Sequence, residues 1–308
     1  MEEQCTSHIL MIKPVAFGFN EETALSNAFM QKEKPSDSAQ KDALIHFNTF
    51  IDKLRAVDIN VTVIEDTPLP KTPDSIFPNN WISFHADGRV ILYPMEAPNR
   101  RLERKERILS HLSSIFEIKK IVDLSHFENE GHFLEGTGSL VLDRSSKVAY
   151  ACLSSRTGTV VLDYWQNIFP EYQIINFHAS DRNGVSIYHT NVMMCVADDF
   201  AVICAEAIVK DIERDLVIKM LKKNGKEPLL ISLNQMSAFA GNMLQVLNNK
   251  GDKVLVMSQS AHDSFTDIQL SFLNAKTEIL TAELGLIETL GGGSARCMMA
   301  ELFLKKKM

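Results

Sequence analysis

Four segments of the chain consist of two apolar arms around a short polar turn, the pattern of a β-hairpin. Their turns centre near Asp87, Ser145, Asp198 and Lys250, at intervals of 58, 53 and 52 residues. The segments are WISFHADGRVILYP (81–94), SLVLDRSSKVAYACLS (139–154), VMMCVADDFAVICAEAI (192–208) and MLQVLNNKGDKVLVMSQ (243–259). So regular a period indicates an internal structural repeat.

Each hairpin is followed by a predicted helix and then by one more short strand. The predicted helices cover 100–116, 160–168, 210–225 and 264–276. In the third of them, Ile212, Leu216 and Met220 recur at helical spacing and predict its buried face. The additional strands are predicted at 119–125, 173–179, 227–233 and 277–284. The repeating unit is therefore strand, strand, helix, strand.

A fifth unit can be assembled only by joining the two ends of the chain. The strand CMMAELFL (297–304) would pair with HILMIKP (8–14), followed by a helix over 41–57 and the strand NVTVIED (60–66). Such pairing closes a ring and removes exposed sheet edges. We therefore predict an α/β fold, a five-bladed pseudo-symmetric propeller forming a single domain over residues 1–308. Two separate α/β domains are the alternative that the chain length favours.

Composition narrows the class of protein further. Hydrophobic residues make up 45% of the chain and charged residues 23%, as in globular proteins, and the formal net charge is −7. An acidic balance argues against nucleic acid as a partner. We find neither an apolar run long enough to cross a bilayer nor a signal-peptide pattern at the N-terminus, so we expect no membrane association. The five cysteines include no CxxC pair, which indicates a reducing, cytoplasmic setting.

The candidate catalytic residues lie just before the first strand of each unit. These entrances read FPNN, LEGTG, YHTN, AFAGN and GGGSARC. Equivalent positions of a closed ring converge on one end of its axis, so we expect the entrances to share one pocket containing Asn80, Glu135, His189, Asn242 and Cys297. A thiol, an imidazole and a carboxylate brought together in this way are suited to covalent catalysis.

Over its full length, the chain resembles the guanidino-group-modifying enzymes of the pentein fold, a superfamily of arginine deiminases, dimethylarginine dimethylaminohydrolases and amidinotransferases. The resemblance lies in GGGSARCMM, LEGTG and YHTN, and it implies catalytic roles for Cys297, Glu135 and His189. PDSIFPNNW resembles the substrate-clamping segment, which implies substrate binding by Asp74 and Asn80. APNRR and SSRTG resemble the segments that bind the substrate α-carboxylate, implying Arg100 and Arg156, with Arg101 and Arg104 as alternatives to Arg100.

Two positions depart from the arginine-using relatives, which grip the cationic guanidinium with two carboxylates. The corresponding residues here are Asn80 and Asn191, both neutral. An amide offers both a donor and an acceptor, which suits a neutral ureido group, whereas a buried guanidinium requires opposing charge. In this respect the chain resembles the citrulline-utilisation hydrolases. We therefore expect Asn80 and Asn191 to bind the ureido group of citrulline.

The implied reaction is hydrolysis of citrulline to ornithine, ammonia and carbon dioxide through a thioester-type intermediate on Cys297. The backbone N–H groups of glycines 291–293 are candidate donors to the oxyanion. We expect no cofactor and no metal, because the histidines lack ligand-like spacing. The expected partner is a small amino-acid substrate, and a homo-oligomer is compatible with the sequence. The alternatives are an arginine or methylarginine hydrolase, an amidinotransferase, and a non-catalytic binding protein of the same fold.

Overall fold

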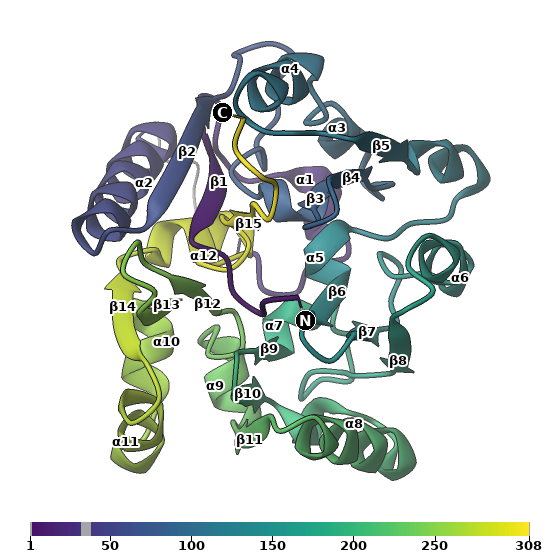
Figure 1. The fold of residues 1–308 in the computed structure, drawn as a ribbon, viewed down its shortest axis with the longest axis vertical. Helices are drawn as coiled ribbons and strands as arrows, with labels where there is room; N and C mark the ends of the chain where they lie inside the picture. The colour runs from purple at the N-terminus through teal and green to yellow at the C-terminus, as the bar shows by residue number, and fades with distance from the viewer. Residues whose placement is uncertain (1, 32–37, 308) are drawn as a thin grey trace.

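The computed structural model describes residues 2–31 and 38–307, which form five units arranged around a central axis (Figure 1). Each unit contains one three-stranded sheet. In every sheet the central strand pairs antiparallel with one neighbour and parallel with the other. This is the strand, strand, helix, strand unit expected from the repeat, and the predicted five-bladed α/β propeller is confirmed.

The strands lie where the apolar runs predict them. The first sheet combines β15 (Ala300–Glu301), β1 (His8–Lys13) and β2 (Asn60–Glu65). The strands of the other four sheets, in chain order, are β3 (Ile82–Phe84), β4 (Arg89–Leu92), β5 (Lys120–Asp123), β6 (Leu140–Asp143), β7 (Val148–Cys152), β8 (Gln173–Phe177), β9 (Met194–Val196), β10 (Phe200–Ile203), β11 (Glu227–Leu230), β12 (Leu244–Leu247), β13 (Lys253–Ser258) and β14 (Glu278–Ala282).

The helices fall into two groups, one on the rim and one of short turns near the axis or in connections. The rim helices are α2 (Ala39–Ala56), α4 (Glu106–Ile115), α6 (Thr159–Ile168), α8 (Asp211–Lys223), α10 (Gln259–Ser264) and α11 (Asp267–Asn274). The shorter segments are α1 (Glu21–Ala24), η1 (Pro78–Asn80), α3 (Pro98–Arg101), η2 (Ser125–Glu130), α5 (Gly136–Ser139), α7 (Thr190–Met193), η3 (Ala205–Ala207), α9 (Leu233–Ser237) and α12 (Gly285–Gly291).

The ring is closed by the two ends of the chain. Strand β15 pairs antiparallel with β1, with Ile9 opposite Glu301 and Leu10 opposite Ala300, and β1 pairs in parallel with β2. The terminal strand is much shorter than the apolar run 297–304 suggests, because residues 295–298 form a turn. After the strand, Leu302 and Leu304 pack into a core cluster with the second unit. That the whole chain forms one domain stays a prediction.

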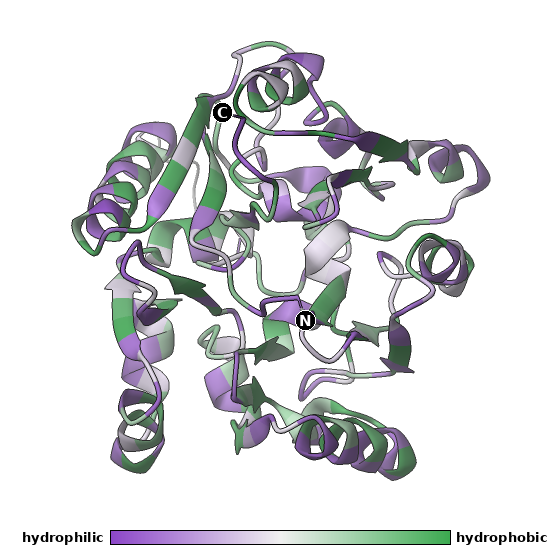
Figure 2. Ribbon diagram, in the orientation of Figure 1, coloured by the Kyte–Doolittle hydropathy of each residue, from purple (hydrophilic) through white to green (hydrophobic). Residues whose placement is uncertain are grey.

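Each rim helix buries one face against its own sheet, and the strands near the centre are mainly hydrophobic (Figure 2). For α8, the face predicted from the sequence is wrong: Ile212 is 79% exposed and Leu216 is 43% exposed. Of the three predicted positions, Met220 is buried, and the helix buries Val217 and Leu221 beside it. A helix turns about 100° per residue, so Val217 lies about 140° around the helix from Ile212. Packing against the sheet therefore buries the apolar pair at positions 217 and 221, which are four residues apart.

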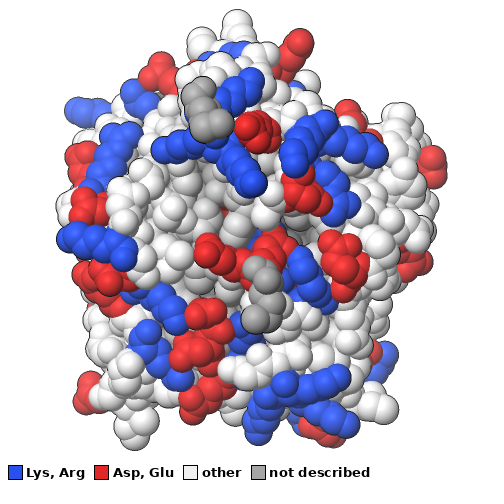
Figure 3. Space-filling view, in the orientation of Figure 1, with Lys and Arg blue, Asp and Glu red and all other residues white. Residues whose placement is uncertain are grey.

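Acidic and basic side chains are interspersed on the face of the molecule shown in Figure 3. Among the described residues, no helix has the length and apolar character needed to span a membrane.

Candidate active site

The strand entrances predicted to converge do meet at one end of the axis. Those of the second, third and fourth units form the short turns η1, α5 and α7, which contact one another. A small cavity of about 10 Å³ lies among them. Six of the eight predicted site residues line it: Asp74, Asn80, Arg100, Arg156, His189 and Cys297. The other two lie outside the lining and contact residues that line the cavity: Glu135 contacts His189, and Asn191 contacts Cys297.

His189 and Glu135 form a buried pair. The Nε2 atom of His189 lies 2.9 Å from Oε2 of Glu135, whose Oε1 accepts the Glu96 N–H at 3.0 Å. Burial raises the pKa of Glu135, but Arg156, 3.6 Å away, together with His189, outweighs it and lowers the pKa to about 2. Burial lowers the pKa of His189, against the opposing effect of Glu135. Because Nε2 faces a carboxylate, it carries the proton, and Nδ1 is left to accept one.

The glycines of LEGTG allow this close packing. A Cβ at Gly138 would lie 2.6 Å from Nδ2 of Asn80 and 2.8 Å from Nδ1 of His189. At Gly136, where φ is +50°, a Cβ would lie 2.3 Å from a backbone oxygen. No larger residue fits at either position without displacing the site. Asn80 and His189 are therefore neighbours across the Gly138 backbone.

The glycine-rich segment before Cys297 also makes room for a neighbour. A Cβ at Gly291 or Gly293 would lie 2.8 or 3.0 Å from the ring of Phe77, and Gly292, at φ +62°, ends α12. The N–H of Gly292 donates to Glu288 O at 2.9 Å. It is therefore not available to a substrate, and the expectation that it serves an oxyanion is wrong.

Two amides contact the sulfur of Cys297. The Nδ2 atom of Asn242 lies 3.3 Å from Sγ, and Nδ2 of Asn191 lies 3.5 Å from it. Asn191 was predicted to bind the substrate, but the structure places its side chain against the sulfur of Cys297, outside the lining of the cavity. For Asn242 the only sequence signal was its place at a strand entrance, and this carried no information about its partner.

The two predicted arginines also line the cavity. Arg100 forms a two-pronged ion pair with Glu103 at 2.9 and 3.0 Å and donates to Oδ1 of Asn80 at 2.8 Å. Arg156 donates to Thr23 O at 2.8 Å. The alternatives considered for Arg100 do not line the cavity: Arg101 binds Met95 O and Glu96 O, and Arg104 binds Tyr93 O and Glu128.

A segment that the sequence did not single out covers the cavity. Residues 17–30 include α1, and several of their side chains make polar contacts around the cavity: Asn20 and Thr23 donate to Oδ2 of Asp74 at 2.7 and 3.0 Å, and Asn27 donates to Gly292 O at 3.2 Å. Burial raises the pKa of Asp74. A cavity of about 10 Å³ holds at most one water molecule, so a larger ligand could enter only if part of the lining moved.

The four cysteines other than Cys297 do not line the cavity. All five are unpaired. Burial raises the pKa of Cys152, Cys195 and Cys204 to about 12, which keeps these thiols protonated and unreactive. In the part of the chain that the structure describes, no three His, Cys, Asp or Glu side chains are grouped as ligands for a metal ion.

Comparisons with known proteins agree with this architecture. Residues 13–304 match the family described as N,N dimethylarginine dimethylhydrolase, eukaryotic. A search of curated proteins by sequence finds no match. A solved structure of the N-terminal domain of ArgZ, an arginine dihydrolase from the ornithine–ammonia cycle in cyanobacteria, bound to substrate, has a TM-score of 0.75 at 14% identity, covering 96% of this chain and 97% of that chain.

Two further solved structures are similar. AgrE in a ternary complex with ornithine and NAD⁺ has a TM-score of 0.74 at 16% identity, covering 98% of this chain and 39% of that chain. A dimethylarginine dimethylaminohydrolase variant, as an adduct with S-methyl-L-thiocitrulline, has a TM-score of 0.66 at 13% identity, covering 97% of this chain and 100% of that chain. These likenesses confirm the pentein fold.

Proposed function

The chain belongs to the N,N dimethylarginine dimethylhydrolase family, and from that premise we propose that it is a cysteine-dependent hydrolase that cleaves the ureido group of citrulline, or of a close analogue, to ornithine, ammonia and carbon dioxide. Cysteine-dependent hydrolysis of a carbon–nitrogen bond is the chemistry that membership of this hydrolase family supports. The choice of a ureido group over a guanidino group rests on the lining of the cavity.

The orientation of the Asn80 amide carries the proposal. A guanidinium can only donate, so the 2.8 Å contact from Arg100 Nη1 requires the carbonyl oxygen of Asn80 on that side. Nδ2 donates one hydrogen to Oδ1 of Asn79 at 3.0 Å, and its second hydrogen is free for a ligand in the cavity that Asn80 lines. A ureido carbonyl oxygen accepts that hydrogen, whereas a guanidinium has only donors to offer.

The charges around the cavity also favour a ureido group over a guanidino group. Among the described residues that line it, two are arginines and one, Asp74, is a carboxylate. Glu135 is fully buried behind His189 and does not line the cavity. Because the proposal assigns Asp74 to the α-ammonium, a cationic head group would find no other carboxylate among the described lining residues, and a buried charge without a partner costs about 3–5 kcal/mol.

The proposed reaction proceeds through a carbamoyl thioester. His189 takes the proton of the Cys297 thiol at Nδ1, and the sulfur forms a bond to the ureido carbon while Asn80 donates to its oxygen. The bond from that carbon to the δ-nitrogen then breaks, and His189 returns its proton to that nitrogen, releasing ornithine. Water, activated by His189, cleaves the thioester to carbamate, which decays to ammonia and carbon dioxide. Glu135 holds the imidazole in register.

The amino-acid end of the substrate lies toward the covering segment in this proposal. Arg156 and Arg100 bind the α-carboxylate, and Asp74, whose Oδ1 is buried without a hydrogen-bond partner, meets the α-ammonium. When residues 17–30 move away, Arg156 exchanges Thr23 O for the carboxylate. The contacts that close the empty cavity are thus replaced by contacts to substrate.

A second candidate is an arginine or methylarginine hydrolase. The unpaired carboxylate oxygen of Asp74 favours it, because that oxygen could face a guanidinium if the substrate bound in the reverse sense. The structural likeness to ArgZ, an arginine dihydrolase, supports the same candidate.

A substrate panel separates these candidates. We expect ammonia and ornithine release from citrulline at a kcat/KM at least about 100-fold above that for arginine or methylarginine, because the lone donor of Asn80 matches a carbonyl oxygen. Amino-acid analysis of timed reactions measures all products, and Cys297→Ser corrects for contaminating activity. Arginine turnover at a rate comparable to that of citrulline would contradict the substrate assignment.

The pH profile tests the role of His189. Since burial lowers the pKa of His189 below its ordinary 6.5, neutral imidazole persists into mildly acidic solution, and the acid limb of kcat/KM for citrulline is expected below pH 6.5. Glu135→Gln removes a charge that raises the pKa of His189, so the limb moves to still lower pH. Glu128→Gln, a control that removes a carboxylate outside the cavity, leaves it in place. A limb at or above pH 6.5 argues against His189 as the base.

A further inference from the structure

We propose that Asn242 and Asn191 stabilise the thiolate form of Cys297 by donating hydrogen bonds to its sulfur. The inference rests on the proposed role of Cys297 as nucleophile. It assigns Asn191 to the nucleophile rather than to the substrate, and gives Asn242 a function that its position in the sequence did not reveal.

The amide of Asn242 can face the sulfur in one orientation only. Its Oδ1 accepts the backbone N–H of Arg296 at 3.1 Å, and its Nδ2 donates to Asn191 O at 2.9 Å. Exchanging the two ends of the amide would set donor against donor and acceptor against acceptor. The side chain is fully buried, so no solvent satisfies a reversed amide. Nδ2 is therefore held 3.3 Å from Sγ by two backbone partners.

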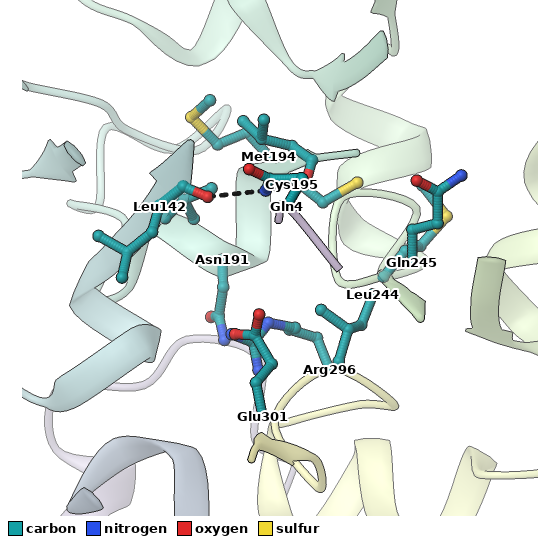
Figure 4. A pocket seen from close by; sticks show the side chains of 12 residues that line it. Gln4, Leu142, Asn191, Met194, Cys195, Leu244, Gln245, Arg296 and Glu301 are labelled. Carbon is teal, nitrogen blue, oxygen red and sulfur yellow. Dashed lines mark hydrogen bonds and ion pairs between the residues drawn. The ribbon is translucent and has the colours of Figure 1, made fainter. Parts of the chain in front are cut away.

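Asn191 approaches the sulfur from the direction of a second cavity on the axis. Its Nδ2 lies 3.5 Å from Sγ, and its buried Oδ1 has no hydrogen-bond partner among the described residues. Figure 4 shows its side chain reaching toward Arg296 and Glu301 in this cavity. With a volume of about 20 Å³, the cavity has room for a water molecule that could donate to Oδ1. That arrangement leaves Nδ2 for the sulfur.

Both amides favour the charged form of the sulfur. The carbonyl oxygen of Asn242, 3.6 Å from Sγ, can accept the proton of the neutral thiol. Once His189 has taken that proton, the two N–H groups remain as donors, and a hydrogen bond to an ionised acceptor is stronger than one to a neutral acceptor. Among the described side chains, these amides are the groups within hydrogen-bond distance of the sulfur.

Several charged groups surround this arrangement and act on either state of the sulfur. Those lining the catalytic cavity are Asp74, Arg100, Arg156 and His189, those lining the axial cavity are Arg296 and Glu301, and Glu135 lies behind His189. None of them is changed by a substitution at position 191 or 242. The contribution of the amides can therefore be measured by changing the amides alone.

Among the described residues, two of the other buried cysteines have an oxygen acceptor at the sulfur but no side-chain amide donor. Cys5 donates its S–H to Oε1 of Gln245 at 3.4 Å, and Cys152 donates to Ile187 O at 3.6 Å. An oxygen acceptor favours the neutral thiol. Donor amides at the sulfur are thus a feature of Cys297 and not a general property of the buried cysteines in this fold.

The test is the pH dependence of Cys297 alkylation by iodoacetamide, followed by mass spectrometry of the labelled peptide without substrate. Asn242→Asp and Asn191→Asp replace a donor with a carboxylate of the same shape. We expect each to move the midpoint of the alkylation profile up by about one pH unit or more, so that labelling near pH 7 is about tenfold slower or worse. Asn79→Asp, a buried control that lies outside the cavity lining and keeps the acceptor for Asn80 Nδ2, leaves the midpoint unchanged.

Near-ultraviolet circular dichroism establishes which variants are folded. If a buried aspartate prevents folding, Asn242→Ser, which removes the donor without adding charge, is expected to move the midpoint in the same direction. Unchanged midpoints in folded variants at both positions, or an equal shift in Asn79→Asp, would overturn the inference. This outcome is distinct from failure of the proposed function, in which Cys297→Ser would retain citrulline turnover.

Discussion

Cys297→Ser is expected to lower citrulline turnover by about 10⁴-fold or more. The serine hydroxyl occupies the same place between the Asn242 and Asn191 amides, but it is a far weaker acid than a thiol and His189 cannot withdraw its proton as readily. Removing the nucleophile of a covalent mechanism leaves only binding and electrostatic contributions. The measurement is ornithine formed per enzyme over hours, at saturating citrulline.

Cys152→Ser is the matched control for this result. Cys152 is fully buried in β7, and its S–H donates to a backbone oxygen, a contact that a hydroxyl can also make. We expect activity within about threefold of wild type, with any loss arising from stability. Turnover by Cys297→Ser within about tenfold of wild type would end the assignment of Cys297 as nucleophile.

Asn80→Asp is expected to reverse the preference between citrulline and arginine. One carboxylate oxygen keeps the contact with Arg100, while the other replaces the only N–H that Asn80 offers to the cavity. The carbonyl oxygen of citrulline then faces an acceptor, and we expect its kcat/KM to fall about 100-fold or more. A guanidinium instead gains a charged partner, so arginine turnover should rise relative to citrulline.

The measurement is the ratio of the two kcat/KM values in the wild type and the variant. Asn79→Asp is the control, because it places the same charge one residue away, keeps the acceptor used by Asn80 Nδ2, and does not line the cavity. A citrulline preference that survives in Asn80→Asp, or an equal reversal in Asn79→Asp, would show that the amide of Asn80 does not select the head group.

Much of the fold could be predicted because its signals are local. A hairpin needs two apolar arms and a polar turn within about 15 residues, and the four that were predicted lie at β3–β4, β6–β7, β9–β10 and β12–β13. The regular interval between them implied the ring. The prediction for α8 was wrong because a row of apolar residues shows that a helix is amphipathic, whereas the neighbouring sheet determines which face is buried.

The sequence likewise predicted some features of the site and missed others. The strand entrances placed His189, Cys297 and Asn80 in one cavity, as expected from their equivalent positions in the repeat. The sequence did not reveal the covering segment around α1, because its contacts with Asp74 and Gly292 join residues separated by about 50 and about 265 positions. Nor did it indicate that Glu103 pairs with Arg100.

From the sequence alone follow the five-unit architecture, the pairing of its ends and the residue types available for catalysis, because periodicity and repeated motifs are properties of neighbouring positions along a chain. Only the tertiary structure decided what each amide does. Arg100 turns the carbonyl of Asn80 away from the cavity, and Cys297 takes the N–H of Asn191. An amide presents a donor at one end and an acceptor at the other, and which end faces a ligand depends on partners that folding brings from distant parts of the chain.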